Sequence, residues 1–131
     1  MIHIVEILRR DPVYKLCTWR HHGNPDQYEN LEWDSSNTVT KPTLAQITAK
    51  WPATKAEIAL EKLRNARNKR IALTDWWASS DLTMSAEQTA YRQALRNITD
   101  TQTPDVDDYL ELTNVTWPTN PQGESTGPNK F

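Results

Sequence analysis

The stretch TKAEIALEKLRNARNKRIALTDWW, residues 54–77, predicts the longest regular element of the chain. Its apolar residues recur at spacings close to three and four, the period of one face of an α-helix. Most of its charged residues fall elsewhere around the helix. The apolar positions are Ala56, Ala59, Leu60, Leu63, Ala66, Leu73 and Trp77. We therefore expect a helix over residues 54–77.

A second helix is expected over residues 85–98, after a short connection rich in Ser, Asp and Thr. Because the connection is short, the two helices should pack as an antiparallel helical hairpin. The residues expected to close the core of this hairpin are Leu63, Leu73, Trp76, Tyr91 and Leu95.

Three helix starts are indicated by a Thr or Ser followed three residues later by Gln or Glu, because such a pair can satisfy two backbone N–H groups reciprocally. The pairs are Thr43 with Gln46, Thr54 with Glu57, and Ser85 with Gln88. Pro42 and Pro52 reinforce the first two, since proline is tolerated at the start of a helix.

The N-terminal part predicts short strands. Residues 2–8 and 13–19 alternate between two faces, and Asp11 and Pro12 between them are typical of a turn. Residues 28–33 offer a third strand. We expect a small antiparallel β-meander here, so that the fold class is α+β with a helical hairpin and an extended C-terminal arm. The expected regions are 1–41, 42–99 and 100–131.

Composition excludes several classes of partner. The formal net charge of −2 gives no overall attraction for nucleic acid or an anionic membrane. A group of basic residues followed by an aromatic one could hold single-stranded nucleic acid. On a helix, however, these basic residues spread around all sides instead of forming one surface. The residues are Arg64, Arg67, Lys69 and Arg70, followed by Trp76. No apolar run is long enough to span a membrane and the N-terminus lacks a signal-peptide pattern, so we expect a soluble protein made in a cytoplasm.

Signs of catalysis or of a cofactor are weak. Cys17, His21 and His22 offer at most one corner of a zinc site, and the acidic residues 105–108 lack a calcium-loop pattern. No glycine-rich phosphate loop and no nucleophile elbow occur. We therefore expect no enzyme, no metal and no cofactor.

Three segments carry a family resemblance. They are residues 73–76, which read LTDW, residues 91–96, which read YRQALR, and Trp117 with Pro118. Their order and spacing resemble those of phage tail assembly chaperone and tail fibre assembly proteins. The clear resemblance covers about half of the chain, and none of its residues performs chemistry.

The resemblance implies a protein that binds a phage tail or tail-fibre protein in the host cytoplasm during assembly. Alternatives are a structural component retained in the virion tail, baseplate or fibre tip, and, as the weakest, a nucleic-acid-binding protein. Self-association is left open, although the long helix lacks sustained heptads. Large aromatic and Arg side chains are enriched where proteins bind one another. The candidate partner-binding residues are Trp76, Trp77, Arg92, Arg96, Trp117, Pro118 and Phe131.

Overall fold

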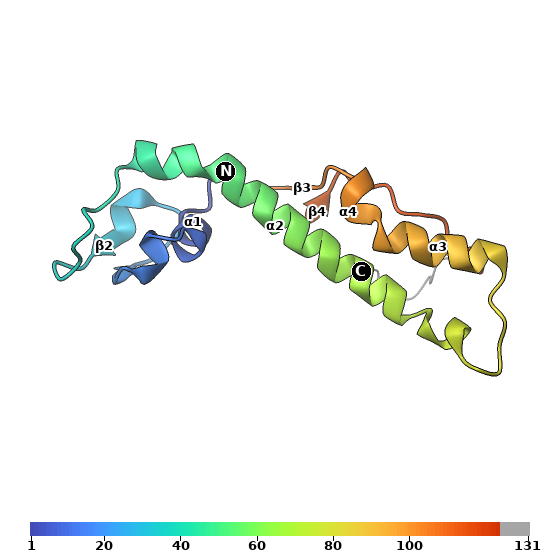
Figure 1. The fold of residues 1–131 in the computed structure, drawn as a ribbon. Helices are drawn as coiled ribbons and strands as arrows, with labels where there is room; N and C mark the ends of the chain where they lie inside the picture. Colours follow the sequence, from blue (N-terminus) through green and yellow to red (C-terminus); the bar gives the residue numbers. More distant parts are fainter. Residues whose placement is uncertain (124–131) are drawn as a thin grey trace. The chain divides into compact units, whose positions relative to one another are not determined.

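The computed structural model describes residues 1–123, which form two compact units (Figure 1). The first unit is Met1–Glu57 and the second begins at Ile58. The boundary lies inside the long helix α2, Leu44–Ala72. Helices and small antiparallel sheets occur together, which confirms the predicted α+β class.

The first unit contains one short α-helix, two short 3-10 helices, a β-hairpin and the beginning of α2. Its elements before α2 are α1 (Ile4–Arg10), η1 (Tyr14–Leu16), β1 (Trp19–His21), η2 (Tyr28–Asn30) and β2 (Leu31–Trp33). The two strands are antiparallel, with Trp19 opposite Trp33 and His21 opposite Leu31. Within residues 1–57 the sheet therefore has two strands, where the sequence suggested three.

The strand predicted over residues 2–8 is wrong, because this segment forms the helix α1. Its apolar residues fit a strand and a helix about equally well. In the structure Ile4, Ile7 and Leu8 are buried together, a spacing of three and four that only a helix places on one side. The local sequence pattern was compatible with both structures, and packing against the rest of the unit determined that this segment is a helix.

The strand predicted over residues 13–19 is also largely wrong, since only Trp19 enters β1. The carboxylate of Asp11 accepts hydrogen bonds from the backbone N–H groups of Val13 (2.9 Å) and Tyr14 (3.1 Å). A short aspartate side chain that binds its own following backbone favours a turn over a strand. The chain consequently turns into η1.

The core of the first unit joins α1, β2 and the start of α2. Several aromatic side chains cover its edges, including Tyr14, Trp33 and Trp51. Its fully buried members are Ile4, Ile7, Leu8, Leu31 and Ile47. Five of the six Trp in the chain are at least partly buried, so aromatic rings supply much of the apolar contact in this small protein.

Helix α2 begins at the first of the predicted helix starts and continues through the second. Thr43 and Gln46 form the expected reciprocal pair, with Gln46 N–H donating to Thr43 Oγ1 over 3.1 Å and Thr43 N–H donating to Gln46 Oε1 over 2.9 Å. The start predicted at Thr54 is wrong, because Thr54 lies inside α2 and its hydroxyl donates to the carbonyl of Lys50. Pro52 is accommodated within the helix.

The second unit holds the helical hairpin, in which α3 runs back beside the later part of α2 (Figure 1). Its elements after α2 are η3 (Asp75–Ala78), α3 (Ala86–Arg96), α4 (Ile98–Thr101), β3 (Asp105–Val106) and β4 (Leu112–Thr113). Ser85 and Gln88 form the predicted pair at the start of α3. The segment expected as an extended arm thus contains the small antiparallel pair β3–β4.

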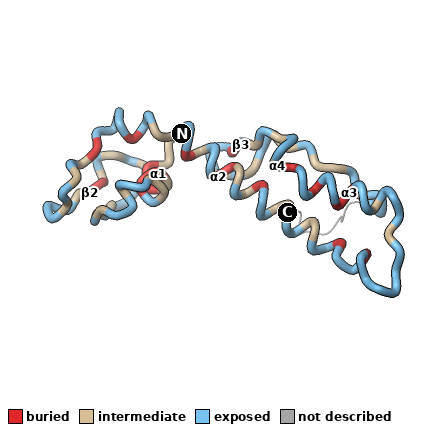
Figure 2. The backbone as a smooth tube through the Cα atoms, viewed as in Figure 1, coloured by how far each residue is buried: buried red, intermediate tan, exposed pale blue. Residues whose placement is uncertain are grey.

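The buried residues of the second unit lie at intervals along α2 and α3 (Figure 2). Trp77, Tyr91 and Leu95 form a cluster, against which Ile71, Met84 and Trp117 pack. Leu63, Ile98 and Val106 are also buried. Tyr91, Leu95 and Leu63 are therefore core residues as predicted.

Candidate partner-binding surface

The turn after α2 is built by Thr74. The helix ends at Ala72, and its last carbonyls lack the usual partners one turn further on. The carbonyl of Ile71 instead accepts from the backbone N–H and the hydroxyl of Thr74, each over 2.9 Å. The carbonyl of Thr74 then accepts from Trp77 N–H over 3.0 Å, which starts the 3-10 turn η3.

Arg92 of α3 binds this turn through three acceptors. Its Nη1 donates to Thr74 Oγ1 over 2.7 Å and to the Ile71 carbonyl over 3.3 Å, and its Nη2 donates to Asp75 Oδ1 over 3.1 Å. A cation at the C-terminal end of a helix is favourably placed relative to the helix dipole. We call Arg92, Ile71, Thr74 and Asp75 the Arg92 cluster.

The Arg92 cluster includes one ion pair. Arg92 pairs with Asp75, and its own side chain is 8% exposed while that of Asp75 is 64% exposed. Because one partner of the ion pair is exposed to solvent, its charge attraction adds little to stability. The main effect of the contact is to hold Arg92 and the turn in a fixed relative position.

The two adjacent tryptophans take opposite roles. Trp77, a candidate partner-binding residue from the sequence, is 3% exposed, and its ring centroid lies 6.0 Å from that of Tyr91. Trp76, predicted to close the core, is 57% exposed and stands edge-on to Trp77 at 6.3 Å. The chain leaves the α-helix at Leu73 and enters a tighter turn, so the helical spacing used for the prediction no longer applies.

Leu73 shares the exposure of Trp76. It lies three residues earlier, is 52% exposed, and was also expected in the core. Leu82, in the connection to α3, is another exposed large apolar residue. We call Leu73 and Trp76 the Trp76 surface. Exposed apolar area of this kind is typical of sites that bind another protein.

The remaining candidate residues lie elsewhere in the second unit. Arg96 is exposed on α3, while Trp117 and Pro118 are half-buried. The guanidinium of Arg70 lies 4.1 Å above the Trp117 ring, a cation–π contact that holds this segment against α2. Phe131 lies outside the described residues.

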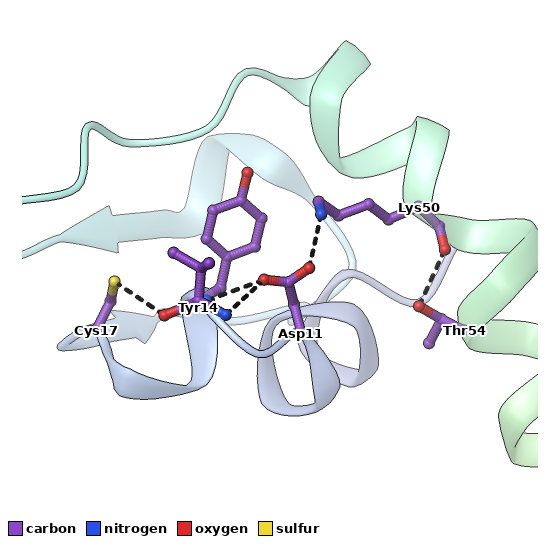
Figure 3. Close-up of polar contacts among 6 residues, drawn as sticks. Asp11, Tyr14, Cys17, Lys50 and Thr54 are labelled. Atoms are coloured by element: carbon purple, nitrogen blue, oxygen red, sulfur yellow. Dashed lines mark hydrogen bonds and ion pairs between the residues drawn. The ribbon is translucent and has the colours of Figure 1, made fainter.

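A separate polar contact organises the first unit (Figure 3). Asp11, after α1, accepts a 2.6 Å hydrogen bond from Lys50 Nζ of α2 in addition to its two backbone bonds. Burial raises the pKa of Asp11, but the hydrogen bonds from Lys50, Tyr14 and Val13 outweigh it, so the pKa lies below its ordinary value of 3.8. The hydrogen bond to Asp11 raises the pKa of Lys50.

Two shallow hollows in the first unit show no convergent catalytic groups. One of about 160 Å³ is lined by Thr18, Trp19, Arg20, Glu32, Trp33 and Asp34. The other, of about 460 Å³, is lined largely by residues 12–18 and 36–39. Within residues 1–123, no three His, Cys, Asp or Glu side chains gather as a metal site requires, and no helix combines the length and apolar character of a membrane crossing.

Sequence reasoning missed the role of Thr74 and Asp75. Neither was proposed as a site residue, yet both bind Arg92. A signal was available, because both belong to the LTDW segment and Arg92 to the YRQALR segment on which the family resemblance depends. Two of the three segments that carry the resemblance are thus joined by hydrogen bonds in the structure.

A comparison with protein families agrees with that resemblance. The family model described as phage tail assembly chaperone protein matches residues 60–122, just under half of the chain. The matched part contains the Arg92 cluster, the Trp76 surface and Trp117. No curated protein and no solved structure matches the chain.

Proposed function

We propose that the chain binds a tail or tail-fibre protein through the Trp76 surface, because its residues 60–122 match the family model described as phage tail assembly chaperone protein. Binding would cover apolar or strand-edge surface of that protein until it assembles, since unpaired strand edges and exposed apolar groups aggregate. This role requires a complementary surface and no catalytic group. It would be performed in the host cytoplasm during phage assembly.

The exposure of Trp76 carries this proposal. A tryptophan that is more than half exposed on an ordered turn keeps a large apolar area in water in the free protein. Burying such a ring against a partner recovers that area with little loss of side-chain entropy, because the turn already holds it. For Leu73, which is 52% exposed in the free protein, burying the remaining area is favourable by about 1–1.5 kcal/mol, half of the value for a fully exposed leucine.

The other candidate residues have two different roles in the proposal. Arg96, Trp117, Pro118 and Phe131 are proposed to contact the partner in addition to the Trp76 surface. Trp77 and Arg92 are buried and so act within the protein, where they support the turn. Self-association through the same surface remains an alternative use of it.

Co-expression with the tail and tail-fibre proteins of the same phage tests the proposal. The wild-type chain should keep one of them soluble and co-purify with it, while Trp76→Ala and Leu73→Ala should weaken the complex. Tyr109→Ala is the matched control, because Tyr109 is an exposed aromatic residue of the same unit. Equal solubility and assembly of those proteins without the chain would refute the chaperone role.

Mass spectrometry of purified virions tests whether the protein leaves after assembly. A chaperone that acts only transiently should be absent from the finished particle. A stoichiometric amount in the virion would favour a structural tail component instead.

A further inference from the structure

In the turn after α2, a polar residue is buried and the apolar residue before it is exposed. Thr74 is 2% exposed although it is polar, whereas the preceding Leu73 is half exposed although it is apolar. Burial of apolar area alone would favour the reverse arrangement. Some other interaction must therefore hold the turn in its observed orientation.

The burial of the tryptophans follows the same division. Thr74 directly precedes η3, and its carbonyl accepts from Trp77 N–H over 3.0 Å. Thr74 and Trp77 are both buried, whereas Leu73 and Trp76 are both exposed. Whichever interaction holds Thr74 inward also selects Trp77 for the core and Trp76 for the surface.

Arg92 makes that interaction. Its Nη1 donates to the Thr74 hydroxyl oxygen over 2.7 Å, and the same hydroxyl donates to the Ile71 carbonyl, so this buried polar group is satisfied both as an acceptor and as a donor. Its Nη2 binds Asp75, the first residue of η3. Arg92 therefore contacts Thr74, which precedes η3, and Asp75, which begins it.

The position of Arg92 in α3 couples this contact to the core. Arg92 directly follows Tyr91, whose ring packs against Trp77. Within residues 1–123, the buried Nε of Arg92 has no hydrogen-bond partner. In the described part of the chain, the guanidinium thus makes all of its hydrogen bonds to the turn through Nη1 and Nη2.

We infer that Arg92 is a positioning residue. It fixes which side of the turn faces the core, so that Trp76, and not Trp77, is exposed to a partner. Without it, the apolar Leu73 and Trp76 compete with Thr74 and Trp77 for the buried face. The inference depends on the proposed function only for the use made of Trp76; the choice between the two tryptophans is a property of the free protein.

Fluorine NMR of the full chain labelled with 5-fluorotryptophan tests the inference. The Trp76 and Trp77 signals are assigned with Trp76→Phe and Trp77→Phe, and a soluble nitroxide is added to broaden the signals of accessible rings. In the wild type the Trp76 signal should broaden strongly and the Trp77 signal weakly. In Arg92→Met this difference should be lost or inverted, and Arg92→Lys should restore part of it.

Arg96→Met is the matched control, because Arg96 lies one helical turn away and is exposed. It should leave the difference unchanged. If Arg92→Met keeps its helical circular dichroism and the wild-type difference, the inference is overturned. If Arg92→Met does not fold, Thr74→Ala decides, since it removes the hydroxyl that Arg92 binds: a reduced difference supports the inference and an unchanged one overturns it.

The experiment separates the two proposals, because it needs no partner. Loss of the difference in Arg92→Met together with unimpaired binding by Trp76→Ala would support the positioning role and refute the Trp76 surface as the binding site. An unchanged difference together with weakened binding by Trp76→Ala would do the opposite.

Discussion

Lys50 Nζ donates a 2.6 Å hydrogen bond to Oδ2 of Asp11, while Oδ1 of the same carboxylate accepts from the backbone of Val13 and Tyr14. One carboxylate thus ends α1, directs the chain into η1 and binds α2. The Asp11 side chain is 10% exposed and that of Lys50 is 42% exposed, so the pair is partly shielded from solvent. Its loss should affect both the local turn and the packing of the first unit.

Asp11→Asn should lower the free energy of unfolding by about 1–2 kcal/mol, because hydrogen bonds to a charged group contribute more than neutral ones but partial exposure of Lys50 reduces the effect. Urea denaturation followed by circular dichroism measures the change. Asp100→Asn, at an exposed position, is the control and should shift the midpoint little. Equal effects of the two substitutions would contradict the role given to Asp11.

The pH dependence of stability should show the same pair. The folded-state pKa of Asp11 is lowered below 3.8, so its contribution is fully present above the unfolded value and is lost as pH falls through the folded value. The stability difference between wild type and Asp11→Asn should therefore be constant near neutral pH and shrink below about pH 4. Denaturation curves at several pH values measure it, and a difference that persists in acid would argue against the assignment.

The alkaline side has the opposite sign. The folded-state pKa of Lys50 is raised above 10.5, so its contribution is present below that value and is lost as pH rises through the folded value. Between the folded-state pKa of Asp11 and that of Lys50, the pair should add a constant amount to the free energy of unfolding.

Trp77→Ala and Trp76→Ala should differ sharply in their effect on stability. Removing the buried Trp77 should cost about 3–5 kcal/mol, as for other large core side chains. Removing Trp76 should cost about 1 kcal/mol or less, since it loses an exposed ring and one edge-on contact. Thermal or urea unfolding of the two variants measures the difference, and similar losses for both would mean that the two rings share the core.

Pro52→Ala should stabilise the protein, because it restores a backbone N–H within α2 and removes the ring from the preceding turn. Proline inside a helix costs up to about 3 kcal/mol relative to alanine. Pro12→Ala is the control, since Pro12 lies in the turn after α1, where proline restricts the unfolded chain and its loss should not stabilise. A destabilised Pro52→Ala would show that the proline has a specific role in α2.

Local signals in the amino-acid sequence predicted several elements correctly. The hydroxyl of Ser85 and the amide of Gln88 meet only if a helix begins between them, and residues 85–98 contain α3 and the start of α4. Thr43 with Gln46 marked the start of α2 for the same reason. Such pairs are three residues apart, so no distant part of the chain is needed to decide them. The α+β class and the family resemblance followed from patterns of similar range.

Interactions between distant residues decided the rest. Residues 2–8 became a helix because Ile4, Ile7 and Leu8 pack against Leu31 and Ile47, which lie far along the chain. Thr74 is buried and Leu73 exposed because Arg92, eighteen residues beyond Thr74, supplies a hydrogen bond that no local pattern reveals. The sequence alone shows two adjacent tryptophans, either of which could bind a partner. The fold determines which ring is exposed, because only in the folded chain does the guanidinium of Arg92 reach the turn.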